Sequence, residues 1–280
     1  MTADIAPLAR VWPAAVWLVL AAWAGGPAVA ADKPVWELGV GLGALSFPNY
    51  RGADEQRTFV APVPYVVYRG ERLRIDRDGA RGLLWSSRRA ELDISVDGAT
   101  PVESSDDGPR AGMEDLDPVL ELGPSLEVDL GGTPNARWSF RLPVRAAIRV
   151  GDRGTGQEGW NMQPQVHLDA PALIGGWDMG FTAGPKFATE AFHDYYYEVE
   201  ADDVRPARPA FDADGGYSGF GLQWTARKRV DRLWVGGFLR YDNLEGAVFE
   251  DSPLVETRHA VSAGIAISWV LWRSHETIET

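Results

Sequence analysis

The stretch WSFRLPVRAAIRV spans residues 138–150, and Arg137 precedes it. Arginine recurs at positions 137, 141, 145 and 149, a spacing that fits one face of a helix or one face of a strand. The apolar residues decide between the two, because they occupy every second position and would scatter around the whole circumference of a helix. Pro143 also opposes a helix, because proline is strongly unfavourable in a helix interior. The segment is therefore predicted to be a strand with one apolar face and one cationic face.

Composition narrows the class of protein. The net charge of −13 argues against a nucleic-acid partner, which would require a basic face. The absence of cysteine excludes a disulfide framework and a cysteine-based metal site. Abundant glycine (31 residues) and tryptophan (12 residues), without leucine-rich helical runs, are typical of an all-β chain.

The amino terminus is predicted to be a cleaved secretory signal comprising residues 1–30. Arg10 precedes an apolar run over residues 11–24, and a small-residue site ends at Ala30. The run is shorter than the roughly 20 residues that a membrane helix needs. No other stretch is long and apolar enough to be such a helix, so the mature chain is expected to enter a membrane only as a barrel.

The period-two pattern recurs along the whole mature chain. It predicts an antiparallel up-and-down transmembrane β-barrel over residues 31–272, with 273–280 as a short periplasmic tail. The predicted strands are 36–44, 59–67, 73–75, 82–85, 92–96, 118–130, 138–150, 160–168, 177–187, 220–226, 233–241 and 261–271. Connections alternate between short turns and long acidic loops, as in outer-membrane barrels. About twelve strands are expected, or ten if the weak pair around Asp78-Gly79 is not formed.

Tryptophans lie near several predicted strand ends, where an aromatic girdle at the lipid headgroups would place them. The girdle is predicted to comprise Trp36, Trp85, Trp138, Trp160, Trp177, Trp224, Trp269 and Trp272. The alternative is aromatic packing in a soluble β-sandwich, which the polar second face of nearly every strand disfavours.

The four arginines define the candidate site, a charge ladder inside the barrel. Arg137, Arg141, Arg145 and Arg149 are predicted to face the lumen beside Glu121, Glu127 and Asp129 of the preceding strand. Glu91, Asp93 and Asp97 are expected to face them across the interior. Two hypotheses remain open: paired charges that fill or narrow the lumen, and a selectivity zone for a small polar solute.

Catalytic and metal chemistry find little support. The four histidines are His167, His193, His259 and His275, and no serine, histidine and acid are expected to converge. Acidic clusters at 76–79, 106–107 and 212–215 lack the spacing of an EF-hand and are interpreted as solvated turns. No catalytic residue, cofactor or metal is predicted.

Four segments resemble, in order, motifs of the MipA/OmpV family of outer-membrane proteins. Residues 48–54 (PNYRGAD) resemble its Asp-Tyr-x-Gly-Ser-Asp loop, and residues 112–124 (GMEDLDPVLELGP) resemble its Gly-x-x-Asp-Leu-Asp-x-x-Leu-Glu-Leu-Gly segment. Residues 183–216, with AGP, YYY and AFDADGG, are similar to a later loop. Residues 251–255 (DSPLV) match the segment before the last strand.

The resemblance implies a non-enzymatic barrel of the Gram-negative outer membrane, in contact with the lipid bilayer and lipopolysaccharide. Members named for MltA interaction are thought to scaffold a lytic transglycosylase and a bifunctional penicillin-binding protein in peptidoglycan synthesis. A small-solute channel or binding barrel with an arginine-lined lumen, and a surface adhesin, are the alternatives. The chain departs from the family's usual aromatic carboxyl terminus, because eight residues follow Trp272.

Overall fold

The computed structural model describes residues 33–76, 79–104, 108–151 and 154–278. The predicted leader, residues 1–30, lies outside the described residues. The barrel strands are β2 (Trp36–Pro48), β3 (Gln56–Arg69), β4 (Leu73–Asp76), β5 (Gly79–Ser86), β6 (Ala90–Ala99), β7 (Val119–Thr133), β8 (Ala136–Gly151), β9 (Gly154–Met162), β10 (Gln165–Ile174), β11 (Trp177–Ala188), β12 (Gly216–Val230), β13 (Leu233–Asn243) and β14 (His259–Arg273). The shorter elements are β1 (Lys33–Pro34), α1 (Glu190–Tyr197), a 3-10 turn (Ala201–Asp203) and β15 (Thr277–Ile278).

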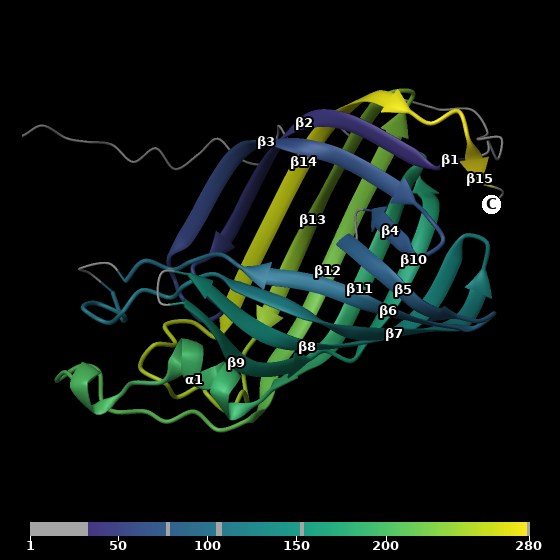
Figure 1. Cartoon of the computed structure of the whole chain (residues 1–280). Helices are drawn as coiled ribbons and strands as arrows, with labels where there is room; N and C mark the ends of the chain where they lie inside the picture. The colour runs from purple at the N-terminus through teal and green to yellow at the C-terminus, as the bar shows by residue number, and fades with distance from the viewer. Residues whose placement is uncertain (1–32, 77–78, 105–107, 152–153, 279–280) are drawn as a thin grey trace, which may run out of the picture.

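These strands close into an antiparallel barrel, confirming the predicted fold (Figure 1). Strand β14 pairs with β2, and β8 pairs with β10, so the sheet returns on itself. Strands β9 and β10 share the neighbours β8 and β11 and form a single barrel strand that is interrupted at Gln163 and Pro164. Counted in this way, the described residues form a twelve-stranded barrel.

The weak strand pair is present, which confirms the count of twelve over ten. Four pairs join β4 to β5, from Leu73↔Gly82 to Asp76↔Gly79. Strand β4 has only four residues, and just two of its residues pair with β3, at Tyr68↔Ile75 and Arg69↔Arg74. The hairpin is therefore much shorter than its neighbours.

On most strands the two faces differ in polarity, as the period-two pattern predicts, but β3 is apolar on both faces, with Phe59, Ala61 and Val63 toward the lumen. On β14, Val261, Ile265, Ile267, Trp269 and Leu271 are exposed on the outside, whereas Ala260, Ser268 and Val270 are buried on the inside. An exposed apolar outer face suits acyl chains, and a polar inner face suits a hydrated lumen. Among the described residues, no helix is both long and apolar enough to cross a membrane.

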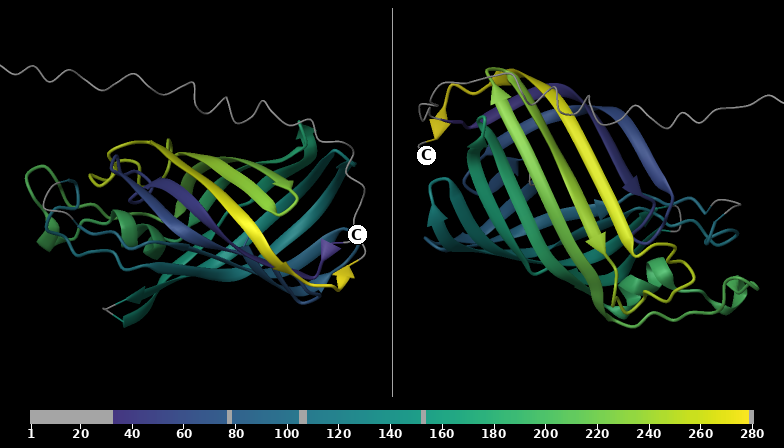
Figure 2. Two further views of the ribbon diagram at one scale, coloured as in Figure 1. Left: turned by 90° about the horizontal axis from the view of Figure 1, so that it is seen from above. Right: turned by 180° about the vertical axis from the view of Figure 1, so that it is seen from behind.

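The two ends of the barrel are built differently (Figures 1 and 2). Short turns and both described chain ends gather at one end, where β1 pairs with β15. The carboxyl-terminal segment beyond β14 thus pairs with residues just before β2. The long connections gather at the opposite end, together with α1. Because short turns are periplasmic in outer-membrane barrels, the end with α1 is taken as extracellular.

A buried carboxylate ties three strands together at the short-turn end. Glu37 on β2 is fully buried, and it accepts hydrogen bonds from Arg69 on β3 (3.1 Å) and from Arg229 on β12. Nearby, Tyr65, Val67 and Val270 form a small apolar cluster with Trp234. Gly236 makes room for the Trp234 ring, because a Cβ there would lie 2.4 Å from it. The lumen is thereby narrowed by side chains at this end.

Replacing Glu37 by alanine is expected to destabilise the barrel by about 2 kcal/mol, because the charge-assisted hydrogen bonds from Arg69 and Arg229, whose side chains are 23% and 30% exposed, are lost. Urea unfolding in detergent micelles, followed by tryptophan fluorescence, measures the change. Glu71→Ala, at an exposed turn position of the same end, is the control and is expected to leave the midpoint unchanged. Equal midpoints for the two variants would contradict a structural role for this cluster.

Candidate functional site

The long connections fold into a compact cap over the extracellular end of the barrel. Its apolar core draws on four of them and consists of Tyr50, Ala53, Val102, Leu116, Tyr197, Ala213, Leu244, Ala247 and Phe249. The rings of Tyr197 and Phe249 stack with centroids 3.7 Å apart. The hydroxyl of Tyr50 donates to Leu254 O (2.7 Å), and that of Tyr197 donates to Arg51 O (2.8 Å). The loops therefore form one packed unit.

The cap contains a helix within the segment predicted to be a long loop, residues 190–215. Helix α1 has eight residues and is amphipathic: Phe192, His193 and Tyr197 are buried, whereas Glu190 is exposed. Local sequence did not indicate it, because a helix of about two turns is stabilised by tertiary packing rather than by helix propensity. The long connection between strands is where the pattern predicts it, but the helix within it was not predicted.

A histidine and a serine meet inside the cap. His193 Nδ1 lies 2.7 Å from Asp214 O, and His193 Nε2 lies 2.5 Å from Ser218 Oγ. Since a carbonyl oxygen only accepts, Nδ1 carries the proton and Nε2 accepts from the serine hydroxyl. The third partner is thus a backbone carbonyl rather than the carboxylate of a catalytic triad, and both side chains are buried. The pair fastens α1 to β12.

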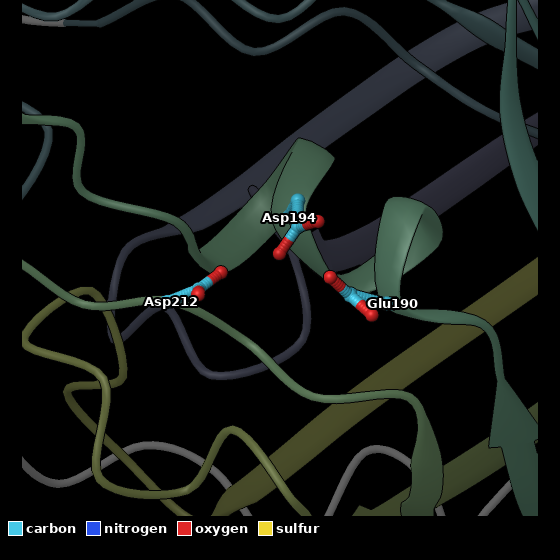
Figure 3. A group of neighbouring side chains, drawn as sticks. All are labelled: Glu190, Asp194 and Asp212. Atoms are coloured by element: carbon cyan, nitrogen blue, oxygen red, sulfur yellow. The ribbon is translucent and has the colours of Figure 1, made fainter.

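Three carboxylates form the group of described residues closest to a cation-binding arrangement (Figure 3). Glu190 and Asp194 of α1 and Asp212 of the following loop place oxygens within 4.8 Å of one another. Burial raises the pKa of Asp194, and the charges of Asp212 and Glu190 raise it further, against a hydrogen bond from the Ala213 N–H. Glu190 and Asp212 are exposed, and exposed acidic groups of like charge do not by themselves define a metal site. The other two acidic clusters include residues outside the described ones.

The lumen holds a cavity of about 1390 Å³. Its roof includes Arg51, Tyr196 and Tyr197 of the cap. Among the described residues that line it, arginine and lysine outnumber aspartate and glutamate by eleven to seven. The lumen is therefore positive although the whole chain carries a net charge of −13.

The predicted ladder residues lie on β7 and β8, with partners that only the structure reveals. Arg141 pairs with Glu127 (3.2 Å), and Arg81 shares this carboxylate at 3.9 Å. Arg145 pairs with Asp97 of β6 (3.5 Å), two strands away along the same wall, so the expectation that the acidic residues of β6 face the arginines across the interior was wrong. The remaining ladder residues have these neighbours: Arg149 pairs with Asp117 and Glu158, Arg137 and Glu121 line the cavity, and Asp129 accepts from Gly131 N.

A second charge cluster escaped the sequence analysis. Lys186 of β11 and Arg240 of β13 both contact Asp242, with Arg240 Nε 2.8 Å from Asp242 Oδ2. The side chains of Lys186 and Asp242 are only 9% and 5% exposed. The alternation of side chains along β13 places residues 240 and 242 on one face. Nothing in the local sequence predicts their contact with Lys186, which lies 56 positions before Asp242.

The tryptophans occupy several levels of the barrel. Trp36, Trp85, Trp138, Trp177 and Trp272 lie at the short-turn end, with Trp269 a little further along β14. Trp160 lies near the cap, where its carbonyl accepts from Thr189 N, and Trp224 lies near the middle of β12. All of them except Trp177 are at least 37% exposed.

A family model described as MltA-interacting protein MipA matches residues 40–271. The NanC porin structure is 8% identical over 84% of this chain and 99% of that chain, with a TM-score of 0.37. An outer-membrane channel from Pseudomonas putida F1 is 11% identical over 86% of this chain and 97% of that chain, with a TM-score of 0.40. OprB from Pseudomonas putida is 8% identical over 87% of this chain and 100% of that chain, with a TM-score of 0.36. No curated protein matches the chain.

Acidification is expected to loosen the cap through His193. Burial lowers the pKa of His193, the charge of Arg51 lowers it further, and the hydrogen bond to Asp214 O opposes the shift. The unfolded cap thus binds a proton more readily than the folded cap. The contribution to stability is complete above the unfolded value of about 6.5 and is lost as pH falls below it.

Limited proteolysis of residues 198–215, with a protease active at both pH 7.5 and pH 5.5, measures this effect as faster cleavage at the lower pH. His193→Gln removes the titrating group and separates its effect from that of the nearby carboxylates. His259→Gln, at an exposed histidine, is the control and should keep the pH dependence. Persistence of the full pH dependence in His193→Gln would rule His193 out as its source.

Proposed function

The chain belongs to the MipA family of MltA-interacting proteins, and we propose that it is a non-enzymatic outer-membrane scaffold that holds cell-wall enzymes at its periplasmic end. It is a barrel of the Gram-negative outer membrane, embedded in the bilayer. The proposed partners follow from the family name and resemblance: a lytic transglycosylase, and with it a bifunctional penicillin-binding protein.

The separation of charge between the two ends is the observation that carries the proposal. At the short-turn end, the described residues include eight exposed bases and four exposed acids. The bases, here called the basic rim, are Lys33, Arg72, Arg88, Arg89, Arg137, Arg229, Arg232 and Arg273, and the acids are Glu71, Asp129, Asp231 and Glu276. The exposed acids of the cap end are Asp54, Glu55, Glu103, Glu114, Asp115, Glu190, Glu200, Asp202, Asp212, Asp214, Glu245, Asp251 and Glu256, with Arg205 and Arg258 as the exposed bases.

A basic rim on an otherwise acidic protein supports a docking surface in the periplasm. Complementary potentials speed the encounter of two proteins and fix their relative orientation. Peptidoglycan and its enzymes lie on this side of the membrane, so a partner with an acidic patch would meet the rim directly.

The channel hypothesis is supported by the size and positive charge of the lumen, but the cap favours the scaffold. Charge-lined lumens select ions only when a continuous path exists. Here the packed cap, held by Tyr50, Tyr197 and Phe249, lies over the extracellular end of the cavity.

Charge reversal on the basic rim is expected to weaken retention of the transglycosylase roughly tenfold, the factor that about 1.4 kcal/mol of lost attraction produces. The variant is Arg72→Glu with Arg232→Glu, and the control with the same change of charge at the cap end is Arg205→Glu with Arg258→Glu. Pull-down of the purified transglycosylase and penicillin-binding protein on immobilised barrel measures retention at several salt concentrations. Equal retention by the two double variants would contradict docking at the rim.

The intact protein is expected to show no steady conductance in planar bilayers, whereas a variant lacking residues 198–215 is expected to conduct, because the cap then no longer covers the cavity. Single-channel recording measures both. Steady, ion-selective currents through the intact protein that change in Arg141→Ala and Arg145→Ala would contradict the scaffold proposal and support the channel hypothesis.

A further inference from the structure

The hydrogen-bonded wall of the barrel is incomplete between β3 and β6. Strand β4 pairs only with Tyr68 and Arg69 of β3, so residues 56–67 have no partner strand on that side within the described part of the chain. Strand β5 pairs with residues 91–95 of β6, and residues 96–99 are likewise unpaired on that side. The short β4–β5 hairpin therefore leaves an opening toward the cap end (Figure 1).

Two prolines stand at the free edge of β3. Arg69 N donates to Val35 O on the β2 side, and Gly70 N donates to Leu73 O on the β4 side. The register between β2 and β3 is unbroken, so successive residues alternate and even-numbered ones point their backbone groups to the open side. Pro62 and Pro64 therefore remove two donors from this edge. Because neither proline can donate a backbone hydrogen bond, the pair disfavours the addition of another strand, as expected for an edge strand.

The opening leads into the lumenal cavity. The cavity is lined by Phe59, Ala61 and Val63 of β3 and by residues 97–100 at the end of β6. Phe59 is 48% exposed, and the side chain of Asp97 is 56% exposed, although both face the inside. Arg57 donates a hydrogen bond to Pro101 O (2.9 Å), and this contact bounds the opening on the side of the cap. Unpaired backbone at membrane depth is tolerated where it borders a water-filled cavity.

An apolar lane crosses the inner wall from this opening. Phe59 lies opposite Leu45, Leu45 lies opposite Gly264, and Gly264 lies opposite Phe238. Gly264 lets the side chains meet, since a Cβ there would lie 2.5 Å from the Phe238 ring and 3.2 Å from Leu45 Cδ1. Phe47 stacks on Phe59 at 5.7 Å. The lane spans three inter-strand spacings, about 14 Å, and is one row of side chains wide.

The lane ends beside a cluster of excess positive charge. Arg240 lies two residues beyond Phe238 on the same face of β13, and it shares Asp242 with Lys186. Arg51 lines the same cavity, donates to Ser218 O (2.9 Å), and has no carboxylate within ion-pair distance among the described residues. Asp97 and Glu121 also interact with this cluster, and Arg145 pairs with Asp97. The four cations Arg51, Lys186, Arg240 and Arg145 therefore exceed the three carboxylates Asp242, Asp97 and Glu121 by one.

We propose that the opening between β3 and β6 is a lateral entrance from the outer membrane, and that the lumen binds a single-chain, long-chain carboxylate. Its tail lies along Phe59, Leu45 and Phe238, and its carboxylate lies against Arg51, Arg240 and Lys186. The width of the lane fits one acyl chain, and the excess of one cation favours an anionic head. This ligand site goes beyond the scaffold role and uses none of the basic rim.

Binding of radiolabelled oleate to the full-length barrel in phosphatidylcholine nanodiscs tests the proposal, with empty nanodiscs as the blank. Oleate is expected to bind saturably. Oleyl alcohol is expected to bind about tenfold more weakly because it carries no charge, and butyrate is expected to show no measurable binding because it has no long apolar tail. Equal binding of oleate and its alcohol would overturn the carboxylate assignment. Absence of saturable oleate binding would overturn the site altogether.

Matched variants locate the ligand. Ala61→Trp places a bulky ring on the lumenal face beside the entrance and is expected to reduce bound oleate at least about tenfold, whereas Val60→Trp, on the lipid face, should leave it unchanged. Arg51→Gln is expected to weaken oleate but not oleyl alcohol, and Arg51→Lys should restore binding. A heat-dependent mobility shift on gels confirms that each variant is folded. Equal effects of Ala61→Trp and Val60→Trp would overturn the lateral route, and an unaltered oleate affinity in Arg51→Gln would overturn the head site, without bearing on the pull-down result.

Discussion

An unpartnered backbone N–H or C=O group is costly in lipid, and this one constraint organises the molecule. It accounts for closure of the sheet through two pairings, β14 with β2 and β8 with β10. It also makes the unpaired edge of β3 informative. Where β4 is too short to reach along β3, the edge carries Pro62 and Pro64 and borders the lumenal cavity rather than another strand.

Much of the barrel could be predicted from the sequence, because a strand buried in lipid on one face and wetted on the other must alternate at every position. That rule located all twelve barrel strands, including the weak pair around Asp78-Gly79. The rule says nothing about segments outside the membrane. Helix α1 and the cap core arise from contacts between residues such as Tyr50, Tyr197 and Phe249, which are far apart in the chain. The break at Gln163 and Pro164 likewise depends on how β9 and β10 meet their shared neighbours.

The candidate site was predictable in its faces but not in its partners. The alternation of side chains along the strand assigns Arg141 and Arg145 to the lumenal face, and both residues line the cavity. Pairing depends on the offset between strands and on the curvature of the wall, so Arg145 reaches Asp97 and Arg149 reaches Asp117 and Glu158. The cluster around Asp242 joins β11 to β13, and no local pattern connects those two strands.

The charges of the molecule divide along the barrel axis, and this division allows two roles without conflict. Acidic side chains gather on the cap, and basic ones gather in the lumen and on the basic rim. A cavity roofed by a packed cap is a poor axial conduit, but it remains open to the bilayer where the wall is incomplete. A ligand held in the lumen would therefore lie away from the basic rim, where a periplasmic partner would dock. The barrel can consequently bind at its side and hold a protein at its base, because each surface is built from different strands and turns.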